Sequence, residues 1–399
     1  RLASPRHLDA AFPRILTANM GIIEPAARLA PNIELSEPVE TGLLTVDLGA
    51  LADNWRKLAA LGDGAECGAV VKADAYGLGL APVLRTLRKA GCRTFFVANV
   101  VEGETARALA PEATIYVLDG LAPGCALRLA AANLRPTLGS FAELDEWTAA
   151  RRTLGRPLEA GLHFDTGMNR LGFAPADAAE LAARDFAPTL VMSHFASSQL
   201  PNAAINARQI AAFDAARRHF PGATASMANS SAAFLPHKPF FDLLRPGYAL
   251  YGGNPTPHAE NPMRPVAGLL ARILAVRDIA PGESVGYDAY WIADRPSRVA
   301  TIGAGYADGA PVSATAGPER PGGEAVVGGR RCPFIGRVSM DYIVLDVTDA
   351  PRASAQRGAW VELIGATITL EEYARRAQTI GYEALTRLGR RYARRYIED

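Results

Sequence analysis

A lysine closes an apolar run in the segment Ala69-Val70-Val71-Lys72. Such a run is typical of a buried parallel strand, and lysine is among the residue types that are least often fully buried. Lys72 therefore either extends its amine to solvent along its aliphatic stem or performs chemistry, and the commonest chemistry of a desolvated lysine amine is a Schiff base. Tyr76 follows one turn later and can reach an anion such as a cofactor phosphate. This segment alone leaves both interpretations open.

Short apolar runs alternate with amphipathic stretches from residue 67 to about residue 250. Eight of the runs are predicted to be strands, at residues 69–72, 94–98, 114–118, 135–138, 159–164, 190–194, 224–227 and 243–249. The alternation predicts βαβ units and a parallel sheet, and this number of repeats suits a closed (β/α)8 barrel. Lys72, His194 and the loop after Phe164 each follow a predicted strand, at the edge where such a barrel carries its active site.

The pattern changes after Pro262. β-rich runs at residues 269–276, 298–302, 324–327, 342–347 and 360–364 lack crossover helices, and helices are predicted at 370–378 and 384–395. We therefore predict an α/β fold, with an N-terminal (β/α)8 TIM-type barrel over residues 41–264 and a mostly β C-terminal domain over residues 265–399. A surplus strand at residues 43–46 precedes the barrel pattern.

Composition excludes several classes of function. The net charge of +1 gives no electrostatic reason for binding nucleic acid or an anionic membrane, and no apolar run approaches the ~20 residues that span a bilayer. The four cysteines show neither metal-ligand spacing nor a disulfide framework, so we expect no metal site and a cytoplasmic location. Residues 1–40 are rich in Ala, Pro and Arg and lack the apolar core of a secretory signal. They are predicted to be an N-terminal arm or a processed leader.

Seven ordered motifs resemble those of the alanine racemases, fold type III enzymes that use pyridoxal phosphate (PLP), from about Leu43 to the C-terminus. The motifs are Lys72-Ala73-Asp74-Ala75-Tyr76-Gly77, Asp165-Thr166-Gly167-Met168-Asn169-Arg170-Leu171-Gly172, Ser193-His194-Phe195-Ala196, Ala228-Asn229-Ser230, Arg245-Pro246-Gly247-Tyr248 with Leu250-Tyr251-Gly252, Gly305-Tyr306-Ala307-Asp308-Gly309 and Gly336-Arg337-Val338-Ser339-Met340-Asp341. The resemblance implies that the strand at 43–46 packs with the C-terminal domain and that Asp47 caps the helix that follows it.

The resemblance also implies a division of catalytic roles. Racemisation needs a base on each face of Cα, and PLP lowers the barrier by delocalising the negative charge that develops there. Lys72 would hold PLP as a Schiff base and act as one base, and Tyr306 would be the other. In the family this tyrosine enters from a second subunit, which implies a homodimer with shared active sites.

Further residues are implied to hold the cofactor and the substrate. An arginine faces the pyridine nitrogen in the family, and here it is Arg245, whose guanidinium keeps its proton and leaves that nitrogen unprotonated. His194 would stack on the ring. Arg170 would bind the substrate carboxylate or the phenolic oxygen of the cofactor, and the Met340 backbone would lie near the carboxylate. Hydroxyl and N–H groups would bind the phosphate, and they come from Tyr76, Asn229, Ser230, Gly247 and Tyr248.

Three positions depart from the family pattern. Leu78 replaces a histidine. His163 stands where many members carry a lysine that becomes carbamylated and orients the arginine, so Arg170 needs another anchor, such as a carboxylate, a backbone carbonyl or a bound anion. Our alignment places Arg390 where some relatives carry a tyrosine near the active site.

The sequence thus predicts PLP-dependent two-base racemisation of L-alanine and D-alanine, which supplies D-alanine for peptidoglycan or degrades it. One alternative is a racemase of broader specificity that acts, for example, on serine. A barrel-type PLP decarboxylase is another, although Arg245 and the Tyr306 motif argue against it. A non-catalytic PLP carrier would lack a second domain, and residues 265–399 argue against that class.

Overall fold

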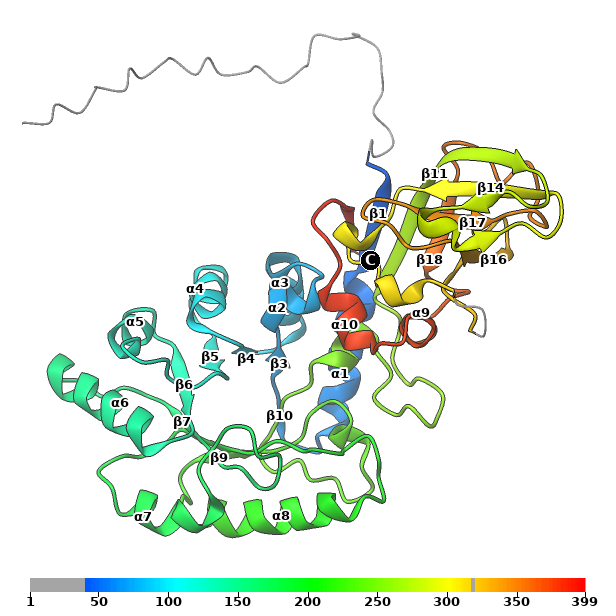
Figure 1. Cartoon of the computed structure of the whole chain (residues 1–399). Coiled ribbons are helices and arrows are strands. Elements are labelled where there is room, and N and C mark those ends of the chain that lie inside the picture. Colours follow the sequence, from blue (N-terminus) through cyan, green and yellow to red (C-terminus); the bar gives the residue numbers. More distant parts are fainter. Residues whose placement is uncertain (1–39, 317–319, 399) are drawn as a thin grey trace, which may run out of the picture. The chain divides into compact units, whose positions relative to one another are not determined.

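The computed structural model describes residues 40–316 and 320–398, and Figure 1 shows a barrel of alternating strands and helices followed by a β-rich domain. Apart from Glu40, the predicted N-terminal extension lies outside the described residues. Residues 40–398 belong to one compact unit.

Eight strand positions close the barrel, as the alternation predicts. Seven parallel strands follow one another in the order β3-β4-β5-β6-β7-β8-β9, and β10 pairs with β2, which leads directly into β3. Backbone bonds from Asp242 N–H to Ala225 O (2.9 Å) and from Val70 N–H to Pro246 O (2.8 Å) join the β10 segment to its neighbours on both sides. The strands are β2 Glu66–Cys67, β3 Ala69–Val70, β4 Thr94–Val97, β5 Thr114–Val117, β6 Arg135–Leu138, β7 Gly161–His163, β8 Leu190–Met192, β9 Thr224–Ser226 and β10 Leu243–Leu244.

Helices surround the barrel, and α3 shows how such a helix buries an apolar stripe against it, whereas the short element α2 is a left-handed turn. In α3, Leu80, Val83, Leu84 and Leu87 recur at helical spacing and are all buried. The barrel helices are α1 Leu48–Leu61, α2 Lys72–Tyr76, α3 Leu80–Ala90, α4 Val100–Leu109, α5 Ala126–Ala131, α6 Phe141–Leu154, α7 Ala178–Ala182 and α8 Ala204–Arg217.

Side-chain caps fix where several of these helices begin. Asp47 accepts the N–H of Ala50 at 2.7 Å at the start of α1, which confirms the expected cap. Asn99 caps α4 and Ser140 caps α6 in the same way.

The C-terminal domain is a closed β-sheet. Its strands run in the order β14-β17-β16-β15-β18-β11, and β14 pairs again with β11. From β11 the sheet continues to β1 (Gly42–Asp47), which is antiparallel to β11 and parallel to β19. The remaining elements are β11 Ala267–Ile279, β12 Ser284–Val285, β13 Trp291–Ile292, β14 Ser297–Ile302, β15 Glu324–Val327, β16 Arg330–Ile335, β17 Ile343–Asp346, β18 Trp360–Ile364, α9 Leu370–Arg376, α10 Gly381–Thr386 and β19 Ala393–Ile397.

Two sequence predictions are wrong in detail. The run 243–249 ends as a strand at Leu244, and a 3-10 turn over Tyr248–Tyr251 follows it. The helix predicted at 384–395 stops at Thr386, and residues 393–397 form β19. The second error arises because β1 hydrogen-bonds the backbone of residues 393–397 as a parallel neighbour. This non-local pairing overrides the helical spacing of the local sequence.

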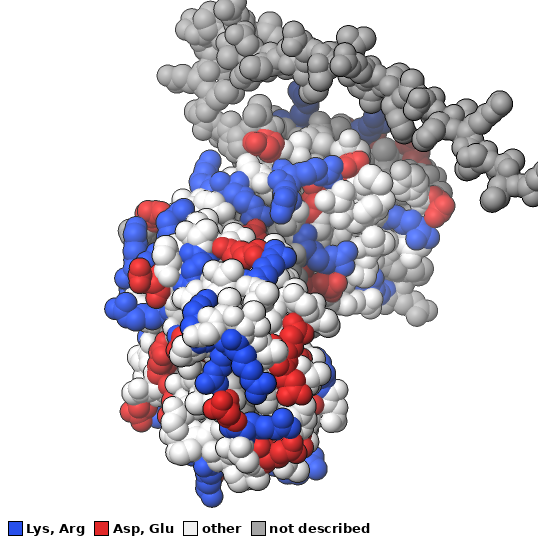
Figure 2. Space-filling model, turned by 90° about the vertical axis from the view of Figure 1, so that its left-hand side faces the viewer, with Lys and Arg blue, Asp and Glu red and all other residues white. Residues whose placement is uncertain are grey.

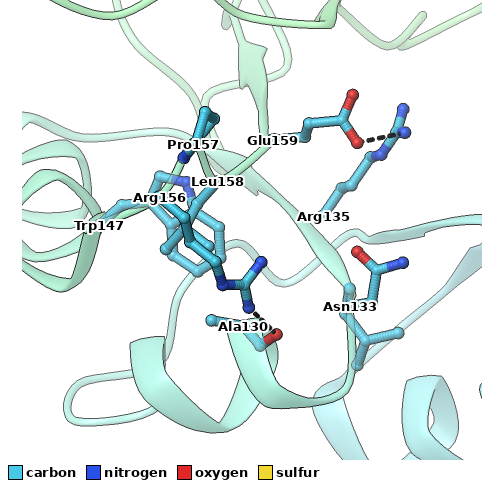
Figure 3. Close-up of a pocket in the computed structure, with 9 residues that line it drawn as sticks. Ala130, Asn133, Arg135, Trp147, Arg156, Pro157, Leu158 and Glu159 are labelled. Atoms are coloured by element: carbon cyan, nitrogen blue, oxygen red, sulfur yellow. Dashed lines mark hydrogen bonds and ion pairs between the residues drawn. The ribbon is translucent and has the colours of Figure 1, made fainter. Parts of the chain in front are cut away.

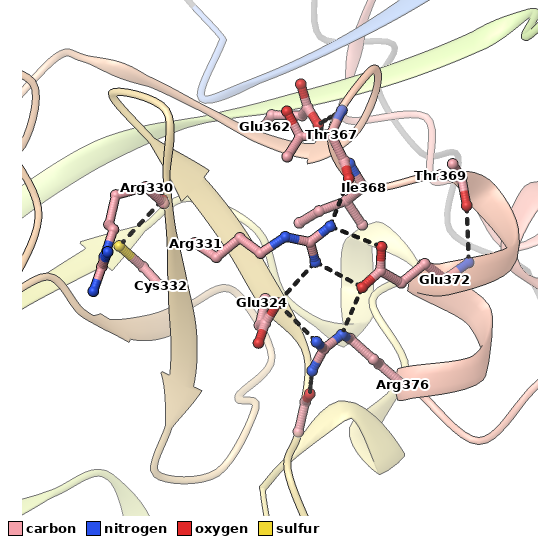
Figure 4. Close-up of polar contacts among 11 residues, drawn as sticks. Glu324, Arg330, Arg331, Cys332, Glu362, Thr367, Ile368, Thr369, Glu372 and Arg376 are labelled. Atoms are coloured by element: carbon pink, nitrogen blue, oxygen red, sulfur yellow. Dashed lines mark hydrogen bonds and ion pairs between the residues drawn. The ribbon is translucent and has the colours of Figure 1, made fainter.

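A network of charged side chains attaches α9 to the sheet (Figure 4). Arg331 lies 3.0 Å from Glu324 and 2.6 Å from Glu372, and Arg376 also pairs with both carboxylates. Arg331 is the most exposed member of the network, so solvent screens its ion pairs, and we take the network to orient α9 on the sheet.

The surface shows no concentration of one charge on the face that Figure 2 presents, where Lys and Arg alternate with Asp and Glu. Within residues 40–316 and 320–398, no helix has the length and apolar character needed to cross a bilayer.

Candidate active site

A cavity of about 610 Å³ opens at the carboxyl ends of the barrel strands. It brings together nine of the eleven predicted site residues, namely Lys72, Tyr76, Arg170, His194, Asn229, Ser230, Arg245, Gly247 and Tyr248. They meet because parallel strands all deliver their following residues to the same edge of the barrel.

Lys72 begins a left-handed turn. The φ angles of Ala73, Asp74, Ala75 and Tyr76 are 54°, 53°, 56° and 55°, and Gly77 continues at 83°. Side chains with a Cβ rarely adopt this conformation, because the Cβ approaches the following carbonyl oxygen. The right-handed helix α3 begins soon after the turn, at Leu80, and the Asp74 carboxylate accepts the N–H of Leu80 at 2.7 Å.

The amine of Lys72 is half-buried and faces positive charge. Burial and then the charge of Arg170 lower the pKa of Lys72, while Asp119 and Glu102 raise it in part. A lowered pKa favours the neutral amine, the form that acts as a nucleophile or a base.

Arg245 is an unusual buried cation. Its side chain is 4% exposed, and its guanidinium donates to the Ser193 carbonyl at 2.6 Å and to the Ser226 hydroxyl. Both of these partners are neutral, and burial lowers the pKa of Arg245 to about 9. A guanidinium has five N–H donors, so N–H groups remain for an acceptor in the cavity.

Two histidines line the same cavity in their neutral form. Burial and then the nearby Arg245 lower the pKa of His194 to about 3 and that of His163 to about 4. At neutral pH both imidazoles are therefore uncharged, and the cationic side chains of the cavity wall are lysine and arginine, alongside the acidic side chains of Asp119 and Glu383.

One end of the cavity combines small residues with hydroxyls. The Ser230 hydroxyl oxygen accepts the N–H groups of Gly247 at 3.0 Å and Ala249 at 3.1 Å. A Cβ at Gly247 would stand 2.3 Å from the Tyr76 hydroxyl oxygen, so only glycine fits this approach. Asn229 uses its carbonyl oxygen to accept the Ser198 hydroxyl at 2.9 Å.

Tyr248, predicted to contact the phosphate, lines the cavity while its side chain makes contacts of its own. Its hydroxyl donates to Glu371 of α9 at 3.2 Å, and its ring stacks on Tyr382 with a centroid separation of 3.9 Å. The hydroxyl is therefore already engaged, although Tyr248 still lines the cavity.

The sequence prediction missed Tyr382, which lines the cavity. Arg390, where our alignment places the tyrosine of some relatives, is exposed and does not line the cavity, whereas Tyr382 in α10 does. Helix α10 contacts α2, and Figure 1 shows the two side by side. A tyrosine in Ile380-Gly381-Tyr382-Glu383 was the available signal, eight residues before Arg390. Asp119, which follows β5, is a second missed lining residue.

Tyr306 and Met340 do not reach this cavity. They lie together in the C-terminal domain, where the N–H of Ala307 donates to the Met340 carbonyl at 3.0 Å. Tyr306 is 41% exposed and Met340 is 54% exposed. Arg391 braces the segment through the carboxylates of Asp308 (2.6 Å) and Asp341 (2.8 Å).

Arg170 is exposed at the cavity mouth, and none of the described residues hydrogen-bonds its guanidinium. The loop that carries it is organised by Asp165, whose carboxylate accepts the N–H groups of Gly167 (2.8 Å) and Arg170 (3.0 Å). His163 lines the same cavity and is 7% exposed. Neither a carboxylate nor a backbone carbonyl of the described chain therefore anchors Arg170.

A second cavity, of about 460 Å³, lies near the amino ends of β6 and β7 (Figure 3). Arg135 pairs with Glu159 there at 2.5 Å, and Arg156 donates to the Ala130 carbonyl at 3.0 Å. It contains none of the predicted site residues, so we place the candidate active site in the first cavity.

Comparison with known proteins identifies the family. Residues 46–255 match the alanine racemase N-terminal domain and residues 266–396 match the alanine racemase C-terminal domain. An alanine racemase of Methylobacterium nodulans is 56% identical over 359 residues, which cover 89% of this chain and 96% of that protein.

Solved structures agree with this match. Alanine racemase from Bartonella henselae with covalently bound pyridoxal phosphate matches with a TM-score of 0.84 and 36% identity. The match covers 90% of this chain and 99% of that chain. The biosynthetic alanine racemase from Pseudomonas aeruginosa has a TM-score of 0.82 and 35% identity, over 90% and 100% of the two chains. The chain therefore belongs to the alanine racemase family.

Proposed function

We propose that this protein is a PLP-dependent alanine racemase that interconverts L-alanine and D-alanine with two bases. The observation that carries the proposal is the cavity that joins Lys72, Arg245 and the Ser230–Gly247 end at the carboxyl edge of the barrel, in a chain of this family. The same enzyme either supplies D-alanine for peptidoglycan or degrades it.

The residues of the cavity fit PLP. Arg245 has N–H donors beyond its two neutral partners, and a pyridine nitrogen offers the lone pair that suits them. The close approach at Gly247 and the hydroxyl of Ser230 suit a phosphate, because N–H and O–H groups bind an anion without burying a second charge. When bound, PLP delocalises the negative charge that develops at the substrate Cα.

Lys72 would attach the cofactor and then move a proton at one face of Cα. Its lowered pKa supports that role, since a larger share of the amine is neutral near physiological pH. Arg170 would bind the substrate carboxylate at the mouth of the cavity, and His194 would pack against the cofactor ring in its neutral form.

Tyr306 would be the second base, supplied by the other subunit of a homodimer. Its exposure, together with that of Met340 in the same segment, supports this arrangement, because neither residue lines the cavity of its own chain. Large apolar side chains exposed beside them, Val312 and Tyr342, suit a buried contact between subunits. Four unpaired thiols support a cytoplasmic location.

The activity is tested by incubating the PLP-loaded protein with L-alanine or D-alanine and measuring enantiomers by chiral chromatography. We expect both substrates to converge on an equal mixture. Equal or faster racemisation of serine would replace the proposal with a racemase of broader specificity. Release of carbon dioxide and ethylamine from alanine without racemisation would instead indicate a decarboxylase.

A further inference from the structure

The left-handed turn after Lys72 has to be held from outside. Four consecutive residues with a Cβ adopt positive φ there, from Ala73 to Tyr76. Such a conformation persists only where surrounding contacts determine it. The direction of the Lys72 side chain depends on the same contacts, because Lys72 is the residue at which the turn begins.

Glu102 makes the contact at the start of the turn. One of its carboxylate oxygens accepts the N–H of Ala73 at 2.8 Å, and the other accepts the N–H of Ala98 at 2.8 Å. Glu102 stands in the first turn of α4, and the backbone N–H of Glu102 donates to the side-chain oxygen of the cap residue Asn99 at 3.1 Å. A glutamate at this position commonly bonds back to the cap residue of its own helix. Here the carboxylate instead ties the loop after β3 to the loop after β4.

Contacts from β19 hold the other end of the turn. Arg394 donates to the Gly77 carbonyl at 2.6 Å, and the Tyr396 hydroxyl donates to the Leu78 carbonyl at 3.1 Å. A Cβ at Gly77 would stand 2.4 Å from the Leu385 carbonyl oxygen, so the turn is also packed tightly against α10. These contacts fix the far end of the turn. The contact at the Ala73 N–H then determines the direction of the Lys72 side chain.

We propose that Glu102 is a positioning residue that fixes the direction of the Lys72 amine in the cavity. This inference rests on the proposed function of Lys72. Both oxygens must be acceptors, because each faces an N–H donor. A glutamine would turn its NH2 group toward one of these donors and lose that bond. The negative charge of Glu102 also raises the pKa of Lys72, against the effect of burial and Arg170.

The barrel contains a matched control. Glu143 stands at the same place in α6, after the Ser140 cap, and accepts the N–H of Gly139 at 2.8 Å. Gly139 precedes its cap residue as Ala98 precedes Asn99. Glu143 thus shares the local geometry of Glu102, but its second backbone contact is Leu121, in the loop after β5. Glu143→Gln therefore makes the same change from carboxylate to amide at the start of a barrel helix, but it leaves the contacts of the turn after Lys72 unchanged.

The test measures how fast the apoprotein captures PLP, followed by its visible absorbance band across a range of pH. We expect Glu102→Gln to lower the high-pH plateau rate by at least about tenfold, because a misdirected amine reacts slowly even when it is neutral. We also expect the pH midpoint of capture to move to lower pH, because the charge that raises the Lys72 pKa is gone. Glu143→Gln should keep both the plateau and the midpoint.

Each outcome decides between the alternatives. A wild-type plateau rate in Glu102→Gln overturns the positioning role, and so does an equal loss in Glu143→Gln. Failure of the wild-type apoprotein to capture PLP overturns the proposed function itself. If Glu102→Gln does not fold, Glu102→Asp tests the proposal instead, because aspartate keeps the negative charge but has a side chain one methylene shorter. It should lower the plateau without moving the pH midpoint, and a wild-type plateau there overturns the proposal.

Discussion

Replacing Ala73 by glycine should stabilise this protein, although glycine usually destabilises. Ala73 has a φ of 54°, and the left-handed conformation costs a residue with a Cβ roughly 1–2 kcal/mol. Glycine removes that cost but adds chain entropy to the unfolded state, which opposes it by about 0.5–1 kcal/mol. The difference between these two ranges is a net gain of about 0–1.5 kcal/mol. Ala73 is exposed, so the methyl group contributes little packing that would be lost.

The measurement is the urea midpoint of the apoprotein, with the slope of the transition as a check on the unfolded state. Ala149→Gly is the control, because Ala149 is equally exposed but lies within the right-handed helix α6. There the same change should cost about 1 kcal/mol. Opposite signs in the two variants are predicted. A loss in Ala73→Gly comparable to that in Ala149→Gly would refute the account of the turn as a strained segment.

Three further predictions concern the site. Mixing inactive Lys72→Ala with inactive Tyr306→Phe should restore part of the activity through hybrid dimers with one intact site, and no recovery where subunits demonstrably exchange would argue that each chain builds its own site. Exchange of chloride for a bulky inert anion should weaken alanine binding if an anion beside His163 anchors Arg170, and an unchanged KM would argue against it. The His163 pKa of about 4 lies below the 6.5 of the unfolded chain, so the contribution of His163 to the free energy of unfolding should be full above pH 6.5 and fall by about 3 kcal/mol as pH drops to 4. His163→Gln should flatten this fall in urea titrations at each pH, and an unchanged slope would remove His163 as its source.

The barrel and most of the site can be predicted from local sequence. Apolar runs at regular spacing mark the strands, and a parallel barrel brings the residues after them to one edge. Lys72, His194 and Arg245 therefore meet in one cavity although they follow strands far apart in the chain.

What the sequence does not predict depends on non-local contacts. Nothing in Ala73-Asp74-Ala75-Tyr76 signals a left-handed turn, because glycine appears only at its end and the contacts of Glu102 and β19 determine it. The strand β19 forms only because β1 offers it an edge. Tyr382 lines the cavity because α10 of the C-terminal half packs on α2, a contact that no local pattern encodes.

Hydrogen exchange in deuterium oxide distinguishes two bases on opposite faces of Cα from a single base. PLP-loaded wild-type protein should exchange the Cα hydrogen of both alanine enantiomers, as followed by NMR. In Tyr306→Phe we predict that racemisation is lost while one enantiomer alone continues to exchange, because Lys72 still serves a single face. Exchange of both enantiomers with racemisation near the wild-type rate would show that Tyr306 is not the second base.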